Sequence, residues 1–190
     1  MNPDHSAALN PERSVVVEAC AGSGKTWLLV SRIVRLLLAG EQGTLIRSTD
    51  GGASFQRLTT PYTGTFFGAL EVADGGLLAY GLRGNAWRSA DQGANWTRIE
   101  LAQPVTLSAA LKLADGAVLL ADESGRLLRG DAAGKAFAPL VGALPTGLSS
   151  LAQAADGALI VSGARGLSRI EATALAATPI TIELSTNNGT

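Results

Sequence analysis

A repeat of 41 residues dominates the sequence from Gly43 onward. Four kinds of marker keep this step: glycines at Gly43, Gly84, Gly125 and Gly166, Asp-Gly pairs at Asp74, Asp115 and Asp156, aromatic rings at Phe55, Trp96 and Phe137, and arginines at Arg47, Arg88 and Arg129. The last copy slips by one residue at some positions. Self-similarity at a fixed period predicts structural units that bury their apolar surfaces against their neighbours.

Each copy contains short apolar runs separated by turn signals. In the second copy the runs FFGALEVA, LLAYGL, NAWRSA and WTRIEL are separated by Asp-Gly and Arg-Gly turns. Such runs are typical of antiparallel hairpins, and none is long enough for a helix. Four strands in about forty residues is the size of one β-propeller blade. We therefore expect a mainly β fold, an incomplete β-propeller of about three and a half four-stranded blades, in which the first copy has only its second half.

One turn has a recognisable pattern, S-x-D-x-G-x-x-[FW], in the first two copies and none that can be recognised in the fourth. The aspartate is expected to accept backbone N–H groups across the turn, the glycine to adopt a positive φ, and the ring to be buried between neighbouring strands. The third copy keeps only the glycine and the ring. The residues assigned to this turn are Ser48, Asp50, Gly52 and Phe55, then Ser89, Asp91, Gly93 and Trp96, and finally Gly134 and Phe137.

This pattern resembles the Asp-box of bacterial neuraminidase repeats. Over residues 43–184 the sequence is similar to Asp-box propellers of the photosystem II assembly and stability factor type. In these families the Asp-box lies at the blade periphery. The resemblance implies a propeller and says little about activity.

Residues 15–40 share no markers with the repeats. The apolar run VVVEA is fit for a buried strand, and leucines and Ile33 recur at helical spacing from Thr26 to Leu38. Between them lies a glycine-rich turn whose sequence fits a phosphate loop, or Walker A motif. The residues expected to contact a nucleotide are Ala21, Gly22, Ser23, Gly24, Lys25 and Thr26. Backbone N–H groups and Lys25 would bind the phosphates of ATP, and Thr26 would ligate Mg²⁺.

Residues 9–40 resemble the N-terminus, with motif I, of UvrD-type and RecB-like superfamily 1 helicases. ATP hydrolysis also needs an acidic motif for Mg²⁺ and water. Asp122 and Glu123, at the end of VLLADE, could be taken for one. However, the same columns read LLAYGL and LIVSGA in the neighbouring copies, so the repeat assigns this run to a propeller strand.

Composition removes several other classes of protein. Cys20 is the only cysteine and His5 the only histidine, which excludes an internal disulfide and disfavours a serine–histidine triad. The net charge of −1 gives no global field that would attract DNA or an anionic membrane. The sequence shows no signal peptide or membrane-spanning run, which predicts a cytoplasmic chain as written.

The sequence thus predicts a tail at residues 1–14, a P-loop strand–turn–helix fragment at 15–41, propeller repeats at 42–184 and a frayed tail at 185–190. The abrupt join near Gly40–Gly43 suggests a chimera or fragment. The favoured function is a non-catalytic interaction or assembly scaffold with an unidentified protein partner and a vestigial P-loop, requiring no cofactor. The alternative is an ATP-binding fragment of a UvrD/RecB-like DNA helicase, which would bind ATP, Mg²⁺ and DNA.

Overall fold

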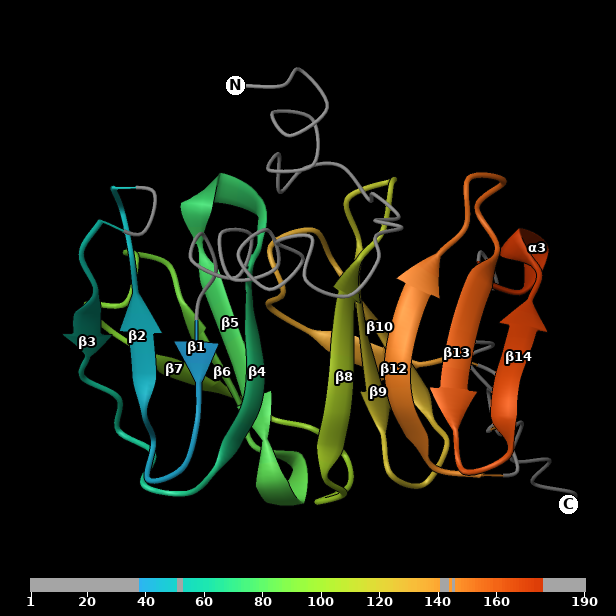
Figure 1. Cartoon of the computed structure of the whole chain (residues 1–190), viewed down its shortest axis with the longest axis horizontal. Helices are drawn as coiled ribbons and strands as arrows, with labels where there is room; N and C mark the ends of the chain where they lie inside the picture. Colours follow the sequence, from blue (N-terminus) through green and yellow to red (C-terminus); the bar gives the residue numbers. More distant parts are fainter. Residues whose placement is uncertain (1–37, 51–52, 141–143, 145, 176–190) are drawn as a thin grey trace, which may run out of the picture.

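The computed structural model describes residues 38–50, 53–140, 144 and 146–175 of the chain (Figure 1). The P-loop residues Ala21–Thr26, the strand–turn–helix expected around them as far as residue 37 and the strand expected at 179–184 lie outside these described residues, as do Gly52 and both predicted tails.

The described residues fold into four antiparallel sheets, which we call blades 1 to 4 in chain order. Blades 2 and 3 have four strands each, and blades 1 and 4 have three described strands each. The strands of blades 1 and 2 are β1 (Leu38–Ala39), β2 (Leu45–Arg47), β3 (Gln56–Leu58), β4 (Phe66–Glu71), β5 (Leu77–Gly81), β6 (Ala86–Ser89) and β7 (Thr97–Ile99). Those of blades 3 and 4 are β8 (Leu107–Lys112), β9 (Val118–Asp122), β10 (Leu127–Gly130), β11 (Phe137–Pro139), β12 (Leu148–Gln153), β13 (Leu159–Gly163) and β14 (Gly166–Ile170).

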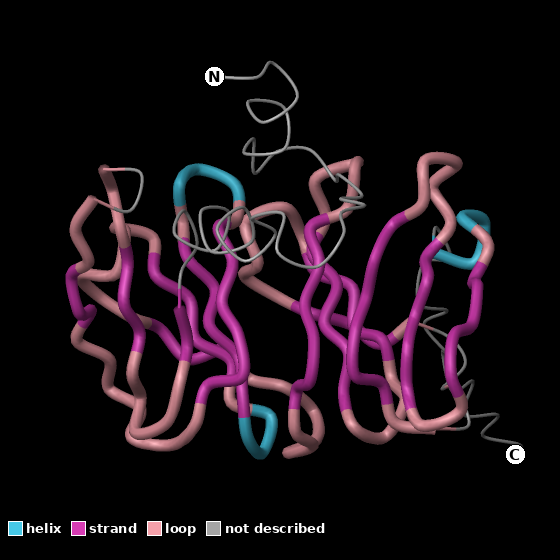
Figure 2. Tube along the Cα trace, in the orientation of Figure 1, coloured by secondary structure: helices cyan, strands magenta, loops and turns pink. Residues whose placement is uncertain are grey.

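In every blade the strands follow one another as an up-and-down meander, for example β4-β5-β6-β7. Helical structure among the described residues is confined to short turns at strand ends: η1 (Ala73–Gly75), η2 (Leu82–Gly84) and α3 (Ala172–Leu175) (Figure 2). The expectation of a mainly β propeller built from four-stranded units is therefore confirmed.

The blades stand in a row, and their innermost strands contact one another in order. β1 contacts β4, β4 contacts β8, and β8 contacts β12. Blade 1 and blade 4 occupy opposite ends of the row (Figure 1). The described part of the molecule is therefore an arc of blades in which the first and the last blade lie far apart.

Apolar side chains fill the three junctions between successive blades. Leu45, Phe66 and Ala79 form the centre of the junction between blades 1 and 2. The junction between blades 2 and 3 is built around β5 and β9, and that between blades 3 and 4 around β9 and β13. Residues that alternate along β9 point to opposite junctions, as strand geometry requires, so Leu119 packs towards blade 4 while Leu120 packs towards blade 2.

Blade 1 differs from the sequence-based prediction in one respect. Leu38, which was assigned to the end of a helix, lies in β1 and pairs with Ile46, while Ala39 pairs with Leu45. Blade 1 therefore has three strands where only two were expected. A run of consecutive leucines fits a buried helix and a buried strand equally well, so pairing with β2 decides its structure here.

Candidate functional site

The carboxylate of Asp122 closes the turn between β9 and β10. It is fully buried and accepts hydrogen bonds from the backbone N–H groups of Ser124 (2.9 Å) and Arg126 (3.0 Å). The guanidinium of Arg126 pairs with its other oxygen at 2.7 Å. β9 lies between β8 and β10 in an antiparallel sheet. Asp122 is therefore a turn-forming residue of blade 3, as the repeat register indicated, and its lone pairs are occupied by protein donors.

The Asp-box turn of blade 2 connects β6 to β7. Asp91 accepts hydrogen bonds from the hydroxyl of Ser89 (2.8 Å), the backbone N–H of Asn95 (2.8 Å) and the side-chain amide of Asn95 (2.7 Å). Gly93 has a φ of 99° and donates its N–H to Ser89 Oγ at 2.7 Å. The indole of Trp96 donates to the carbonyl oxygen of Gly93 at 3.1 Å. All four residues assigned to this turn therefore lie together, with the aspartate at its centre.

The corresponding turn of blade 1 repeats the same hydrogen bonds around Asp50. Its carboxylate accepts from Ser48 Oγ (2.8 Å), the Ser54 N–H (2.9 Å) and Ser54 Oγ (2.6 Å). In blade 3 a reduced version remains, in which Asp131 accepts from the N–H of Lys135 at 3.1 Å and Gly134 has a φ of 64°.

These hydrogen bonds stabilise the charged form of both aspartates. The hydrogen bonds from Ser54 hold the pKa of Asp50 well below its usual value, with Ser48 adding to the effect. The backbone and side chain of Asn95 lower the pKa of Asp91 to about 2, with Ser89 contributing. The carboxylates are therefore used within the turns and are not poised for acid–base chemistry near neutral pH.

The aromatic rings of the three turns have different environments, which corrects the expectation that all are buried between strands. Trp96 packs against the junction of blades 1 and 2, and Phe137 packs against the junction of blades 2 and 3. Each is half-buried, so the ring of one blade contacts the blade before it. Phe55 belongs to blade 1, has no earlier blade among the described residues, and is 42% exposed.

The repeated arginines connect neighbouring blades. Arg47 donates from Nη1 to the carbonyl oxygen of Gln92 at 3.2 Å, and Arg88 donates from Nε to that of Ala133 at 2.5 Å. In both cases the acceptor lies 45 residues downstream, in the Asp-box turn of the next blade. These two contacts therefore run from one blade to the next. Arg129 does pair with its own blade, through Asp115 at 2.6 Å.

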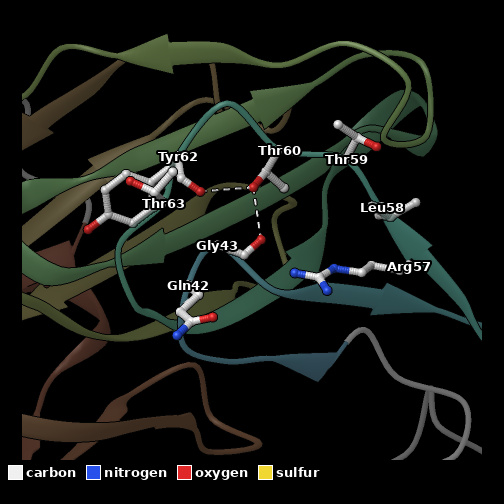
Figure 3. Close-up of a pocket in the computed structure, with 8 residues that line it drawn as sticks. All are labelled: Gln42, Gly43, Arg57, Leu58, Thr59, Thr60, Tyr62 and Thr63. Atoms are coloured by element: carbon white, nitrogen blue, oxygen red, sulfur yellow. Dashed lines mark hydrogen bonds between the residues drawn. The ribbon is translucent and has the colours of Figure 1, made fainter.

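A pocket of about 350 Å³ lies at the end of blade 1 where β1 turns into β2 (Figure 3). Arg57 supplies the one charged side chain among the residues that line it. The rest of the lining is mostly polar: Gln42, Gly43, Leu58, Thr59, Thr60, Tyr62 and Thr63. The Thr60 hydroxyl lies 2.8 Å from the carbonyl oxygen of Gly43 and 3.1 Å from that of Tyr62, which ties the two sides of the pocket together.

Arg57 has no acidic partner among the residues that the structure describes. It donates from Nη2 to Thr44 Oγ1 at 3.3 Å, and its side chain is exposed. At the equivalent position of blade 2, Arg98 lies 3.9 Å from Glu100, and the residue that corresponds to Glu100 in blade 1 is Thr59. The pocket therefore offers a guanidinium whose counterpart in the next blade is already paired.

This pocket was not predicted from the sequence. The signal was present in the repeat, because Arg57 and Arg98 occupy one column while the acid two residues later is kept only in the second copy. Among the described residues, no group of three or more histidine, cysteine or acidic side chains could hold a metal ion. None of the helices described here has the length and apolar character needed to cross a bilayer.

Comparison with known proteins finds one kind of relative for the start of the chain and another for the described blades. Residues 1–48 match the family model of the UvrD/REP helicase N-terminal domain. The match includes the predicted P-loop and extends across β1 and β2. No curated protein matches the chain.

Solved structures define the described residues as part of a β-propeller. One similar structure is YCF48 bound to D1 peptide, 20% identical with a TM-score of 0.58, where the match covers 71% of this chain and 47% of that chain. YCF48 from Cyanidioschyzon merolae is 19% identical with a TM-score of 0.57, covering 71% of this chain and 48% of the other. Virginiamycin B lyase from Staphylococcus aureus is 17% identical with a TM-score of 0.57, covering 72% and 52%.

At these identities the likeness concerns the fold alone. The chain spans about half the length of the propellers that it matches. The chain thus combines a first segment similar to a helicase family with repeats that have the propeller fold. Both findings agree with the prediction of a chimera or fragment.

Proposed function

We propose that the blades act as a non-catalytic scaffold that binds a protein partner. The observation that carries this proposal is the fold shared with YCF48, whose structure is described as bound to D1 peptide. The non-catalytic part of the proposal is supported by the carboxylates of the Asp-box turns and of Asp122, because they accept the hydrogen bonds that close these turns.

Within this scaffold, we propose the Arg57 pocket as one contact point for the partner. A pocket of about 350 Å³ is at the small end of the range for ligand sites and can hold one or two side chains. A guanidinium binds carboxylates through paired hydrogen bonds, and threonine and glutamine side chains can add further ones. The pocket is therefore suited to an acidic side chain or a terminal carboxylate of a polypeptide.

The experiment is fluorescence anisotropy with a library of labelled peptides, each made in two versions that carry glutamate or glutamine at one position. We expect some glutamate peptides to bind, and Arg57→Gln to weaken their binding at least fivefold. Arg98→Gln is the matched control, because Arg98 occupies in blade 2 the repeat position that Arg57 occupies in blade 1, and it already lies beside Glu100. Equal binding of both peptide versions would agree with the proposed scaffold but would contradict the proposed role of the Arg57 pocket. Failure of every peptide to bind would contradict the scaffold itself.

A second function is favoured by one specific observation, the match of residues 1–48 to the UvrD/REP helicase N-terminal domain. On this alternative, Lys25 and Thr26 bind ATP and Mg²⁺, and the chain is a fragment of a DNA helicase. We propose instead that the loop is vestigial, so that titration calorimetry with ATP and Mg²⁺ detects weak binding or none. A micromolar affinity that Lys25→Ala abolishes, with ATP hydrolysis stimulated by single-stranded DNA, would establish the alternative.

A further inference from the structure

Every junction between blades is made by the same register positions. On the side of a blade that faces the next blade, one register position is occupied by Leu45 on β2, by Ala86 on β6 and by Leu127 on β10. These three residues are 0%, 0% and 4% exposed, because the following blade covers them. The exposed fraction of the residue at this position therefore shows whether another blade packs against that side.

Blade 4 carries an apolar residue at the same position without a covering blade among the described residues. Leu167 pairs with Ser162 as Leu127 pairs with Ala121, so the two leucines occupy equivalent places. Leu167 is 77% exposed. Ile160, which matches the fully buried Leu119 of blade 3, is only half-buried. We call Ile160, Ser162 and Leu167 the outer face of blade 4.

Blade 1 has the complementary unfilled side. Ile46 corresponds in register to Trp87 of blade 2 and Leu128 of blade 3, both of which pack onto the preceding blade. Phe55 corresponds to Trp96 and Phe137, which do the same, and it is 42% exposed. The two ends of the arc therefore carry the two halves of one more junction.

We infer that a second copy of this chain supplies that junction. The two ends lie on opposite sides of the arc (Figure 1), so blade 4 is not closed by blade 1 of its own chain. The chain covers about half of the propellers that it resembles. Two arcs related by a two-fold axis along the channel would place each blade 4 against the partner's blade 1 and close a ring of about eight blades, within the usual range.

Closure of this kind buries both unfilled faces at once and leaves no sheet face open at either end of the arc. Ser162 stands where blade 2 has Tyr80 and blade 3 has Ala121, so the new junction is less apolar than those inside the chain. We therefore expect a dimer that dissociates on dilution, in contrast to an obligate one.

The test is sedimentation equilibrium of the full chain over a range of concentrations. The wild-type chain is expected to approach twice its monomer mass as concentration rises, and Leu167→Asp is expected to remain monomeric with an unchanged circular dichroism spectrum. Phe67→Asp is the control, because Phe67 is equally apolar and 48% exposed but lies on β4, away from both ends. A monomeric wild type, or a Leu167→Asp variant that still dimerises, would overturn the inference.

The direction of the contact can be tested separately by cross-linking. In a Cys20→Ser background, chains that carry Ile46→Cys are mixed with chains that carry Leu167→Cys and are treated with a short bis-maleimide reagent. The ring predicts a cross-linked dimer from the mixture and little from either variant alone. Efficient cross-linking of Leu167→Cys alone would mean that blade 4 meets another blade 4, which contradicts ring closure.

Discussion

Arg88 of blade 2 donates a hydrogen bond from Nε to the carbonyl oxygen of Ala133 in blade 3, at 2.5 Å. Arg47 makes the corresponding contact with Gln92, one repeat earlier. Each arginine thus leaves its own sheet and satisfies a backbone acceptor in the Asp-box turn of the following blade. The turn that defines the repeat is therefore also a point at which successive blades are joined.

Removal of this contact should weaken the junction between blades 2 and 3. Arg88→Ala should lower the free energy of unfolding by about 1–2 kcal/mol, because the Ala133 carbonyl loses a charged donor. Arg98→Ala should cost less than about 0.5 kcal/mol, since its ion pair with Glu100 is exposed. Urea denaturation measures both. Equal losses in the two variants would show that the contact between blades adds nothing.

Two glycines of the same repeat column should respond very differently to substitution. A Cβ added to Gly125 would lie 2.3 Å from the carbonyl oxygen of Leu144, whereas one added to Gly166 would meet nothing within 4 Å. Both have a positive φ, of 89° and 90°. Gly166→Ala should cost about 1 kcal/mol from the backbone conformation alone, and Gly125→Ala about 3 kcal/mol or more because backbone must also move. Thermal unfolding of the two variants checks this, and similar losses would contradict the close approach.

The chain should lose stability in acid as Asp91 is protonated. Its pKa is about 2 in the folded protein and near the ordinary carboxyl value in the unfolded chain, so the unfolded chain binds protons first as pH falls. The stabilising effect is therefore complete above roughly pH 4 and is lost as the pH falls towards about 2. Asp91→Asn should show a shallower decline of the urea midpoint over this range. A decline as steep as that of the wild type would assign the acid sensitivity to other groups.

The rings of the first two Asp-box turns should contribute unequally to stability. Trp96→Ala should cost about 2–3 kcal/mol, because the half-buried indole packs on the junction of blades 1 and 2 and donates to Gly93. Phe55→Ala should cost less than about 1 kcal/mol at a protein concentration low enough to keep the chain monomeric, since the ring is 42% exposed in the single chain. Guanidinium denaturation at one pH is sufficient. A Phe55→Ala loss as large as that of Trp96→Ala would mean that Phe55 is covered in solution.

The architecture could be predicted from the sequence because the turns and packing contacts of one blade recur in the next, so the residues that make them repeat every 41 positions. The Asp-Gly and Arg-Gly pairs mark tight turns, and Asp122 was correctly assigned to a strand because the neighbouring copies share its column. The strand at Leu38–Ala39 was missed, because only its pairing with β2 distinguishes it from a helix.

Other features depend on what stands beside a residue, which a repeat does not encode. Phe55 and Trp96 look equivalent in sequence, yet only the second has a preceding blade to cover it. The Arg57 pocket carries a guanidinium without the acid that stands two residues later in the next copy, and its two sides are joined by the Thr60 contacts across blade 1. Whether Lys25 and Thr26 bind a nucleotide stays a prediction, since they lie outside the described residues.

The arginine contacts also bear on how such a chain can change in length. Donor and acceptor sit at fixed places within consecutive units, so an in-frame tandem duplication of one unit would bring its own donor and find its own acceptor. Loss of a single codon between a donor and its acceptor would instead shorten the separation of that pair and misplace its arginine. Evolution of this chain is therefore expected to proceed by gain or loss of whole units.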